Sequence, residues 1–275
     1  MTQATDAIGG IESEGKIRLI PYLLVQKRIV FALLMREILT RYGRHNIGFL
    51  WLFIEPMIFT IGITALWTAT KATHGSDIPI TAFAVTGYSS VLLWRNMPAR
   101  CIGAITPNLS LMYHRNVRPL DIFIARIALE GMGATTSFVV LSIVFNSVDW
   151  MDAPDDILMV IGGWVLLAWF GGSLALLLGA LSERYEIVEK LWHPTAYLLF
   201  PLSGAAFSVN VLPPAGREFL LYFPMVNGVE IVREGYFGAK YIAHFDVTYT
   251  IVFCLALTLL GFAAERIMSR EVVPE

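Results

Sequence analysis

Five ionisable side chains interrupt the long apolar stretches of this chain: Glu55, Arg95, Arg100, Arg126 and Glu130. A charged side chain in hydrocarbon costs about 2.5 to 3.5 kcal/mol on insertion scales, so such groups tend to face the interior of a helix bundle. Arg126 and Glu130 are four residues apart and can pair on one helical face. Arg95 and Arg100 have no acidic residue near them in sequence, so they need a distant partner such as Glu55 or an anionic ligand. A structural ion pair and an anion site both fit this pattern.

The sequence carries no recognisable catalytic motif. It has no Gly-x-x-x-x-Gly-Lys-Ser/Thr phosphate loop and no His-Glu-x-x-His pair, and its five histidines are scattered without metal-ligand spacing. No basic groove with interleaved aromatic residues points to nucleic acid. We therefore expect no catalytic residue, no metal site and no nucleic-acid partner. If ATP drives this protein, the ATPase must be on a separate chain.

Composition indicates a polytopic membrane protein. Hydrophobic residues make up 56% of the chain and charged residues 15%, and the mean hydropathy is +0.63, which leaves too few charges to cover a soluble surface. Cys101 and Cys254 both lie in apolar sequence, which favours buried packing over a disulfide. The first twenty residues hold charges such as Glu12 and Arg18 and no apolar segment with a cleavage site, so no signal peptide is expected.

Six apolar segments are near the roughly 20 residues that a helix needs to cross about 30 Å of hydrocarbon. They cover residues 47–70, 81–107, 122–148, 157–181, 191–212 and 247–264. The connections are short and leave no room for a soluble catalytic domain. We predict an all-α polytopic membrane protein with six transmembrane helices, divided into a cytoplasmic N-terminal segment (1–46) and a transmembrane domain (47–275).

Basic residues set the expected orientation. Seven Lys and Arg residues precede the first apolar segment, whereas the connection after the third segment holds four aspartates between residues 149 and 156 and no basic residue. By the positive-inside rule the N-terminus is cytoplasmic. An even number of spans returns the C-terminus to the cytoplasm, where Arg266 and Arg270 follow the last segment.

Two further segments are neither spans nor free loops. Residues 17–42 are helix-prone but hold five charges between Lys27 and Arg41, which favours an interfacial amphipathic helix on the cytoplasmic face over a solvated leader. Residues 213–240 are too apolar for a free loop and too interrupted by Pro and Gly for a lipid-facing span. For this region we predict re-entrant helices near the outer face, with an interfacial capping loop as the alternative. Its candidate functional side chains are Arg217, Glu230, Arg233 and Glu234.

Several stretches of the chain resemble one family of proteins, the permease subunit of the ABC transporter that exports bacterial capsule polysaccharide. The stretches are the approach to the first span (36–56, with Gly48-Phe-Leu-Trp51 and Glu55-Pro56), the loop before the third span with its start (115–130), and the end of the fifth span with the outer region (201–204, 212–213 and 229–238). One position departs from the family, which usually has Asn-Pro where this chain has Phe223-Pro224. No role is therefore assigned to that side chain.

The resemblance implies a multi-pass protein of the bacterial inner membrane that forms a homodimer and binds two copies of a separate ATP-binding subunit. ATP and Mg²⁺ would be bound by that subunit, so no cofactor is expected on this chain. The implied substrate is a lipid-linked anionic polysaccharide, and the further partners are a periplasmic adaptor and an outer-membrane polysaccharide channel. Two alternatives stay open: a permease of the same plan that exports O-antigen, teichoic acid or a drug, and a polytopic membrane enzyme acting on lipid-linked sugars.

The resemblance also implies roles for particular residues. Short cytoplasmic helices at 36–46 and 108–121 would transmit closure of the ATP-binding subunits, and the candidate coupling residues are Arg41, Arg44, Arg115, Arg118 and Asp121. A conduit at the dimer axis would be lined by Arg95 and Arg100, which would guide acidic groups. Aromatic rings pack on sugar faces, so further candidates for the conduit are Tyr88, Trp94, Trp164 and Trp169. For each single ring, interface anchoring or core packing is the simpler explanation.

Overall fold

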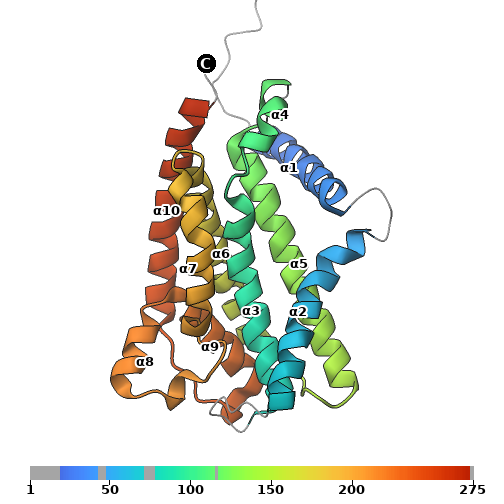
Figure 1. The fold of residues 1–275 in the computed structure, drawn as a ribbon, viewed down its shortest axis with the longest axis vertical. Helices are drawn as coiled ribbons and strands as arrows, with labels where there is room; N and C mark the ends of the chain where they lie inside the picture. Colours follow the sequence, from blue (N-terminus) through green and yellow to red (C-terminus); the bar gives the residue numbers. More distant parts are fainter. Residues whose placement is uncertain (1–18, 43–47, 71–77, 115–116, 273–275) are drawn as a thin grey trace, which may run out of the picture.

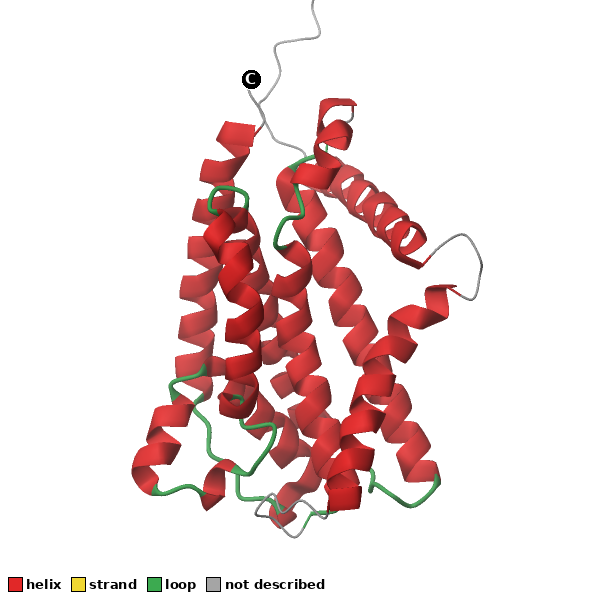
Figure 2. Ribbon diagram, viewed as in Figure 1, coloured by secondary structure: helices red, strands yellow, loops and turns green. Residues whose placement is uncertain are grey.

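The computed structural model describes residues 19–42, 48–70, 78–114 and 117–272. The described part consists of helices and loops without a strand, as Figure 2 shows, which confirms the predicted all-α class. Among the described helices, four are long and apolar enough to cross a membrane. They are α2 (Gly48–Thr70), α5 (Pro119–Ser147), α6 (Ile157–Ser182) and α10 (Val247–Val272).

Two more helices, α3 (Ile80–Cys101) and α7 (Glu186–Leu202), stand beside these in the bundle (Figure 1). Their ends differ from the apolar segments in the sequence. Helix α3 ends six residues before the predicted 107, and α7 begins five residues before the predicted 191 and ends ten before 212. Glycines explain why α3 and α7 end early. Gly103 lies two residues after the last residue of α3 and Gly204 two residues after that of α7, and they take positive φ angles of 64° and 73°. Apolar sequence continues past each turn, so hydropathy alone overestimates the length.

Helix α6 is the centre of the bundle and packs against α3, α9 (Pro224–Phe237) and α10. Glycines allow the close approach. A Cβ atom at Gly163 would lie 2.8 Å from the backbone nitrogen of Val232 in α9, and one at Gly171 would lie 2.7 Å from the Cα of Trp94 in α3. Small residues at such crossings are typical of helix packing in membranes.

Helix α1 (Leu19–Tyr42) crosses α5 obliquely at the end of the bundle that carries α4 (Leu109–His114), as Figure 1 shows. Its inner side includes the buried Ile38, which packs with Leu52 of α2 and Leu129 of α5. Large apolar side chains elsewhere along the helix are exposed, among them Phe31 and Leu39. The bundle therefore covers only part of the apolar surface of α1.

The opposite end of the bundle holds α8 (Pro214–Leu221) and α9, together with the 3-10 helices η2 (Val209–Val211) and η3 (Gly238–Lys240). Helix α9 is almost entirely buried, whereas α8 keeps most of its residues at the surface. Proline begins both helices, at Pro214 and Pro224, where its fixed φ suits the first turn.

Candidate functional site

A network of charged side chains joins α1 to α5 near the end that carries α4. Arg41 of α1 contacts the Glu130 carboxylate of α5 and lies 3.0 Å from Glu37 on its own helix. The Nε atom of Arg126 in α5 lies 3.1 Å from Glu37 Oε1. All four side chains are at most 16% exposed. Positive and negative groups therefore alternate across this helix contact.

The network continues into α3 and α2 through Arg100. Its Nε lies 3.4 Å from Glu130 Oε1 and its Nη2 lies 4.0 Å from Glu55 Oε1, while its carbonyl oxygen accepts a hydrogen bond of 2.6 Å from Arg126 Nη1. Glu55 is thus a partner of Arg100, one of the two options open from the sequence. The expected pair within α5 is replaced, because Arg126 pairs with Glu37 and Glu130 pairs with Arg41 and Arg100. Glu37 was not among the predicted residues, since sequence spacing reveals pairs within one helix and not between helices.

Arg95 and Arg100 line the same polar cavity of about 440 Å³, between α2, α3, α5 and α7. The Arg95 guanidinium lies 5.8 Å from the centre of the Tyr197 ring, and within the described residues it contacts no carboxylate. His193 also lines this cavity. His193 and Tyr197 were missed in the sequence, although they lie four residues apart and so on one face of a helix.

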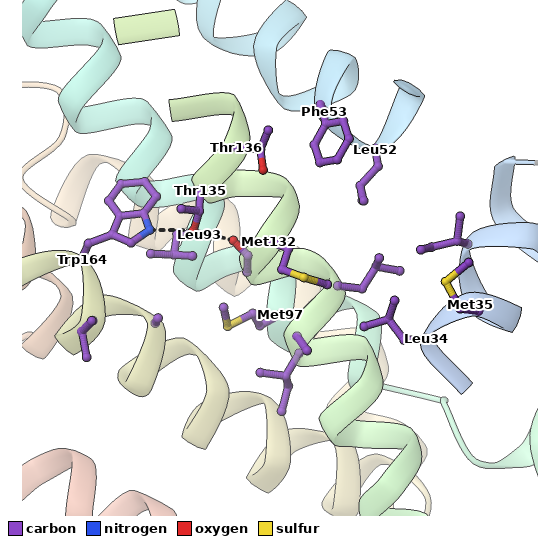
Figure 3. Close-up of a pocket in the computed structure, with 17 residues that line it drawn as sticks. Leu34, Met35, Leu52, Phe53, Leu93, Met97, Met132, Thr135, Thr136 and Trp164 are labelled. Atoms are coloured by element: carbon purple, nitrogen blue, oxygen red, sulfur yellow. Dashed lines mark hydrogen bonds between the residues drawn. The ribbon is translucent and has the colours of Figure 1, made fainter. Parts of the chain in front are cut away.

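An apolar cavity of about 720 Å³ lies between α1, α2, α3, α5 and α6 (Figure 3). Leu34 and Met35 of α1 lie at one end of it and Trp164 of α6 at the other, with the Trp164 Nε1–H donating a 2.9 Å hydrogen bond to Thr135. Leu52 lines both this cavity and the polar one, and a Cβ at Gly133 of α5 would lie 3.1 Å from Leu52. The two cavities therefore adjoin at the contact between α2 and α5.

The four aromatic residues predicted for the conduit occupy helix packing positions within the chain. Trp94 is fully buried with its ring 6.0 Å from that of Phe170, and Tyr88 packs edge-on against Phe200 at 5.8 Å. Trp169 donates a 3.0 Å hydrogen bond to Thr258 of α10. Trp164 stacks on Phe138 at 4.5 Å. The structure does not bring these rings to the cavity that holds Arg95 and Arg100.

Of the predicted coupling residues, Arg44 and Arg115 lie outside the described residues, and Arg41 belongs to the charged network. Asp121 accepts a 2.9 Å hydrogen bond from the Arg118 backbone N–H, which caps α5, and it also accepts one from Gln26 of α1. Asp121 therefore joins the start of α5 to α1.

A second connection at this end was not predicted. The Glu183 carboxylate, just after α6, accepts hydrogen bonds of 2.8 Å from the Ile105 backbone N–H and 2.9 Å from the Thr106 hydroxyl. The neighbouring Ser182 hydroxyl accepts one of 3.1 Å from the Gly103 N–H. The only sequence signal for these hydrogen bonds is that Glu183 is the first charged residue after an apolar segment.

At the other end, Arg233 and Glu230 of α9 are fully buried with their charged atoms 4.0 Å apart. Arg233 donates hydrogen bonds of 2.6 and 2.7 Å to the carbonyl oxygens of Gly204 and Ala205, and its guanidinium lies 3.6 Å from the centre of the Phe83 ring. Glu230 accepts hydrogen bonds of 2.5 Å from the Tyr241 hydroxyl and 3.1 Å from the His244 backbone N–H. These contacts fix α9 to α3 and to the turn after α7.

The other two candidates of this end lie nearer the surface. Arg217 of α8 donates a 3.1 Å hydrogen bond to the Asn210 carbonyl oxygen, and Glu234 is half-buried on α9. His244 follows α9, and burial together with the nearby Arg217 lowers its pKa, so the neutral ring is favoured beside the Asn210 side-chain oxygen at 3.0 Å.

No cluster of three His, Cys, Asp or Glu side chains suited to a metal ion occurs in the described ranges. Cys101 and Cys254 are both buried and free. The charged side chains described above form ion pairs, and several of them line polar cavities.

Comparison with known proteins identifies a protein family and several relatives of this chain. The family model described as ABC-2 type transporter matches residues 28–237. The capsule polysaccharide export inner-membrane protein BexB of Haemophilus influenzae is 41% identical over 253 residues, which cover 92% of this chain and 96% of BexB. The capsule polysaccharide export inner-membrane protein CtrC of Neisseria meningitidis is 42% identical over the same shares. The polysialic acid transport protein KpsM of Escherichia coli is 27% identical over 88% of this chain and 94% of KpsM.

Proposed function

The chain belongs to the ABC-2 type transporter family, and from this membership we propose that it is the membrane-spanning subunit of an ATP-driven exporter of capsule polysaccharide. The observation that carries the proposal is the identity of 41 to 42% with BexB and CtrC over 92% of the chain. An inner-membrane location follows from the same relatives. These relatives favour export over a catalytic role on lipid-linked sugars, because both are named as polysaccharide export proteins.

The proposal includes partners. This chain forms a homodimer and binds two copies of an ATP-binding subunit, which holds ATP and Mg²⁺, since the sequence lacks a phosphate loop. A periplasmic adaptor and an outer-membrane channel complete the path of a lipid-linked anionic glycan. Large exposed apolar side chains on α2 and α7, such as Phe59 and Leu198, support contact with a second copy or with lipid.

Purification from the native membrane tests this assignment. We expect an ATP-binding protein to co-purify in a one-to-one ratio with this chain, and we expect cells that lack the chain to keep capsule polysaccharide inside. Identification of the bound proteins and fractionation of the glycan measure the two results. Turnover of a lipid-linked sugar by the purified chain, without any ATPase partner, would favour the enzyme alternative.

We also propose six spans with both termini in the cytoplasm, α1 on the cytoplasmic face and α8 and α9 as re-entrant helices near the outer face. The placement of α4 and the end of α10 at one end of the bundle, opposite α8 and α9, supports this orientation (Figure 1). A cysteine introduced at Asp152 should react with an impermeant thiol reagent in intact spheroplasts, and one at Arg270 only after permeabilisation. Labelling in the reverse order contradicts the model.

Export should depend on Arg95 in the order Arg, then Lys, then Gln. A guanidinium can hold a carboxylate or phosphate by two hydrogen bonds, which Lys reproduces only in part. We expect Arg95→Gln to lower export about tenfold, since one charged hydrogen bond is worth about 1.5 kcal/mol. Surface glycan per cell is the measurement.

Arg95 gives a cleaner test than Arg100 because its partner is the neutral Tyr197 ring, whereas Arg100 contacts Glu55 and Glu130. The thermal midpoint of each purified variant serves as the control for folding. An Arg95→Gln protein that is as stable as the parent and exports at the parent rate rules out the guiding role.

A further inference from the structure

A second polar cavity, of about 390 Å³, lies where α1 meets the end of α3, the 3-10 helix η1 (Thr106–Asn108) and α5. Its size falls in the range of small-ligand sites. Four guanidinium groups and one carboxylate line it, namely Arg36, Arg41, Arg100, Arg126 and Glu37. The carboxylates of Glu55 and Glu130, which pair with Arg100 and Arg41, line the neighbouring polar cavity instead. The four arginines therefore exceed the three carboxylates that contact them, Glu37, Glu55 and Glu130, by one positive charge.

Arg36 has no carboxylate partner among the described residues, and one donor of Arg126 pairs with a carboxylate but lacks an aligned hydrogen-bond acceptor. Arg36 donates a 2.7 Å hydrogen bond to the neutral side-chain oxygen of Asn108, and it contacts no carboxylate in the described part of the chain. The Asn108 amide group donates in turn to the Ala104 carbonyl at 2.8 Å, which fixes its oxygen toward Arg36. The buried Nε–H of Arg126 has no aligned acceptor, although Glu37 Oε1 is 3.1 Å away. The cavity thus presents oriented donors that suit an oxyanion.

The position of the cavity indicates which oxyanion can reach it. It lies at the ends of helices, beside α5, which is long and apolar enough to cross a membrane. Helix α1 at its edge exposes large apolar side chains: Leu24, Val25, Phe31, Met35 and Leu39. A helix with charged and apolar sides lies at the boundary between headgroups and acyl chains. Phosphate groups of lipids are found at that depth.

We propose that this cavity binds the phosphate of an anionic phospholipid from the leaflet that contains α1. Basic pockets between membrane helices bind anionic headgroups on the cytoplasmic side of other proteins. The guanidinium of Arg36 comes from α1, that of Arg100 from α3 and that of Arg126 from α5. A bound phosphate therefore joins three helices, and the lipid holds α1 in place against the bundle.

Substitution of Arg36 tests the site without threatening the fold, because Arg36 is exposed and outside the ion-pair network. The whole complex is purified and mixed with phosphatidylcholine nanodiscs with or without phosphatidylglycerol, and native mass spectrometry counts the retained lipid. We expect the parent to retain phosphatidylglycerol in preference to phosphatidylcholine. Arg36→Gln should weaken that retention about fivefold, the equivalent of about 1 kcal/mol for one basic residue. Arg36→Lys should retain an intermediate amount of phosphatidylglycerol, because Lys keeps the positive charge and lacks the paired N–H donors of the guanidinium.

Arg270→Gln is the matched control, since Arg270 is an exposed basic residue in the last turn of α10 at the same end of the bundle (Figure 1). It should retain as much phosphatidylglycerol as the parent. Phosphatidylglycerol should also raise the thermal midpoint of the parent more than that of Arg36→Gln, because a ligand stabilises the state that it binds.

Three results overturn the inference: no preference of the parent for phosphatidylglycerol, equal losses in Arg36→Gln and Arg270→Gln, or retention of a glycan-bearing lipid while phosphatidylglycerol fails to bind. The measurement needs no ATP and no added glycan, because any glycan-bearing lipid would come with the purified complex. Its failure is therefore distinct from failure of the export function, which surface glycan reports.

Discussion

Arg233→Met is expected to remove most folded protein from the membrane. The substitution leaves the Gly204 and Ala205 carbonyl oxygens without their donors and leaves Glu230 buried without its positive neighbour. Removing one partner of a buried pair costs about 3 to 5 kcal/mol, and total stability is often only about 5 to 15 kcal/mol. The yield of monodisperse protein and its thermal midpoint measure the effect.

Lys240→Met is the control for that substitution, because Lys240 also pairs with a carboxylate, Asp152 at 3.0 Å, but both side chains are more than 70% exposed. Exposed pairs contribute about 0 to 1 kcal/mol.

Gly87→Ala tests the same site from the side of α3, since its Cβ would lie 2.5 Å from Arg233 Nη2 and 2.7 Å from the Ala205 oxygen. Gly162→Ala, with open space around it, should be harmless. If Gly87→Ala and Gly162→Ala are equally stable, the described packing of Arg233 is wrong.

Glu130→Gln is expected to loosen the contact of α1 with α3 and α5. Glu130 is the shared partner of Arg41 and Arg100, so its loss leaves two guanidinium groups close together without this carboxylate. We expect a loss of about 3 kcal/mol in stability, as for other buried pairs, together with reduced export. Thermal unfolding and surface glycan are the two measurements.

A double-mutant cycle separates the pair from the rest of the network. Adding Arg41→Gln to Glu130→Gln should restore part of the stability, because one of the unmatched charges is then removed. Glu186→Gln is the matched control, since Glu186 pairs with Lys190 at 3.3 Å on an exposed face of α7. A Glu130→Gln protein that unfolds like Glu186→Gln shows that the network contributes little.

Each of the six predicted apolar segments overlaps a described helix, and four of these helices are long and apolar enough to cross about 30 Å of hydrocarbon. The helix ends were less predictable. Gly103 and Gly204 end α3 and α7 by their backbone angles, and nothing in the hydropathy marks them.

The candidate site was predictable only in part. The charges in apolar sequence pointed to Arg100 and Glu130, but their partner Arg41 comes from α1, and contacts between helices are not visible in sequence spacing. Residue type also does not say which way a ring points. Trp94 was a candidate for the conduit and lies wholly inside the chain, whereas Tyr197 faces Arg95. The functional roles of these residues stay predictions.

The glycines of α6 have a consequence for how the molecule can move. Backbone-close contacts at Gly163 and Gly171 tie α6 to α9 and α3, and such contacts cannot slide without clashes. Helix α2, in contrast, is the least buried of the four described helices that can cross a membrane, and its close contacts with α5 include those of Gly133 with Leu52 and of Ser137 with Phe53. A transport stroke would therefore carry α3, α6 and α9 as one rigid body, with the hinge on the side of α1 and α2.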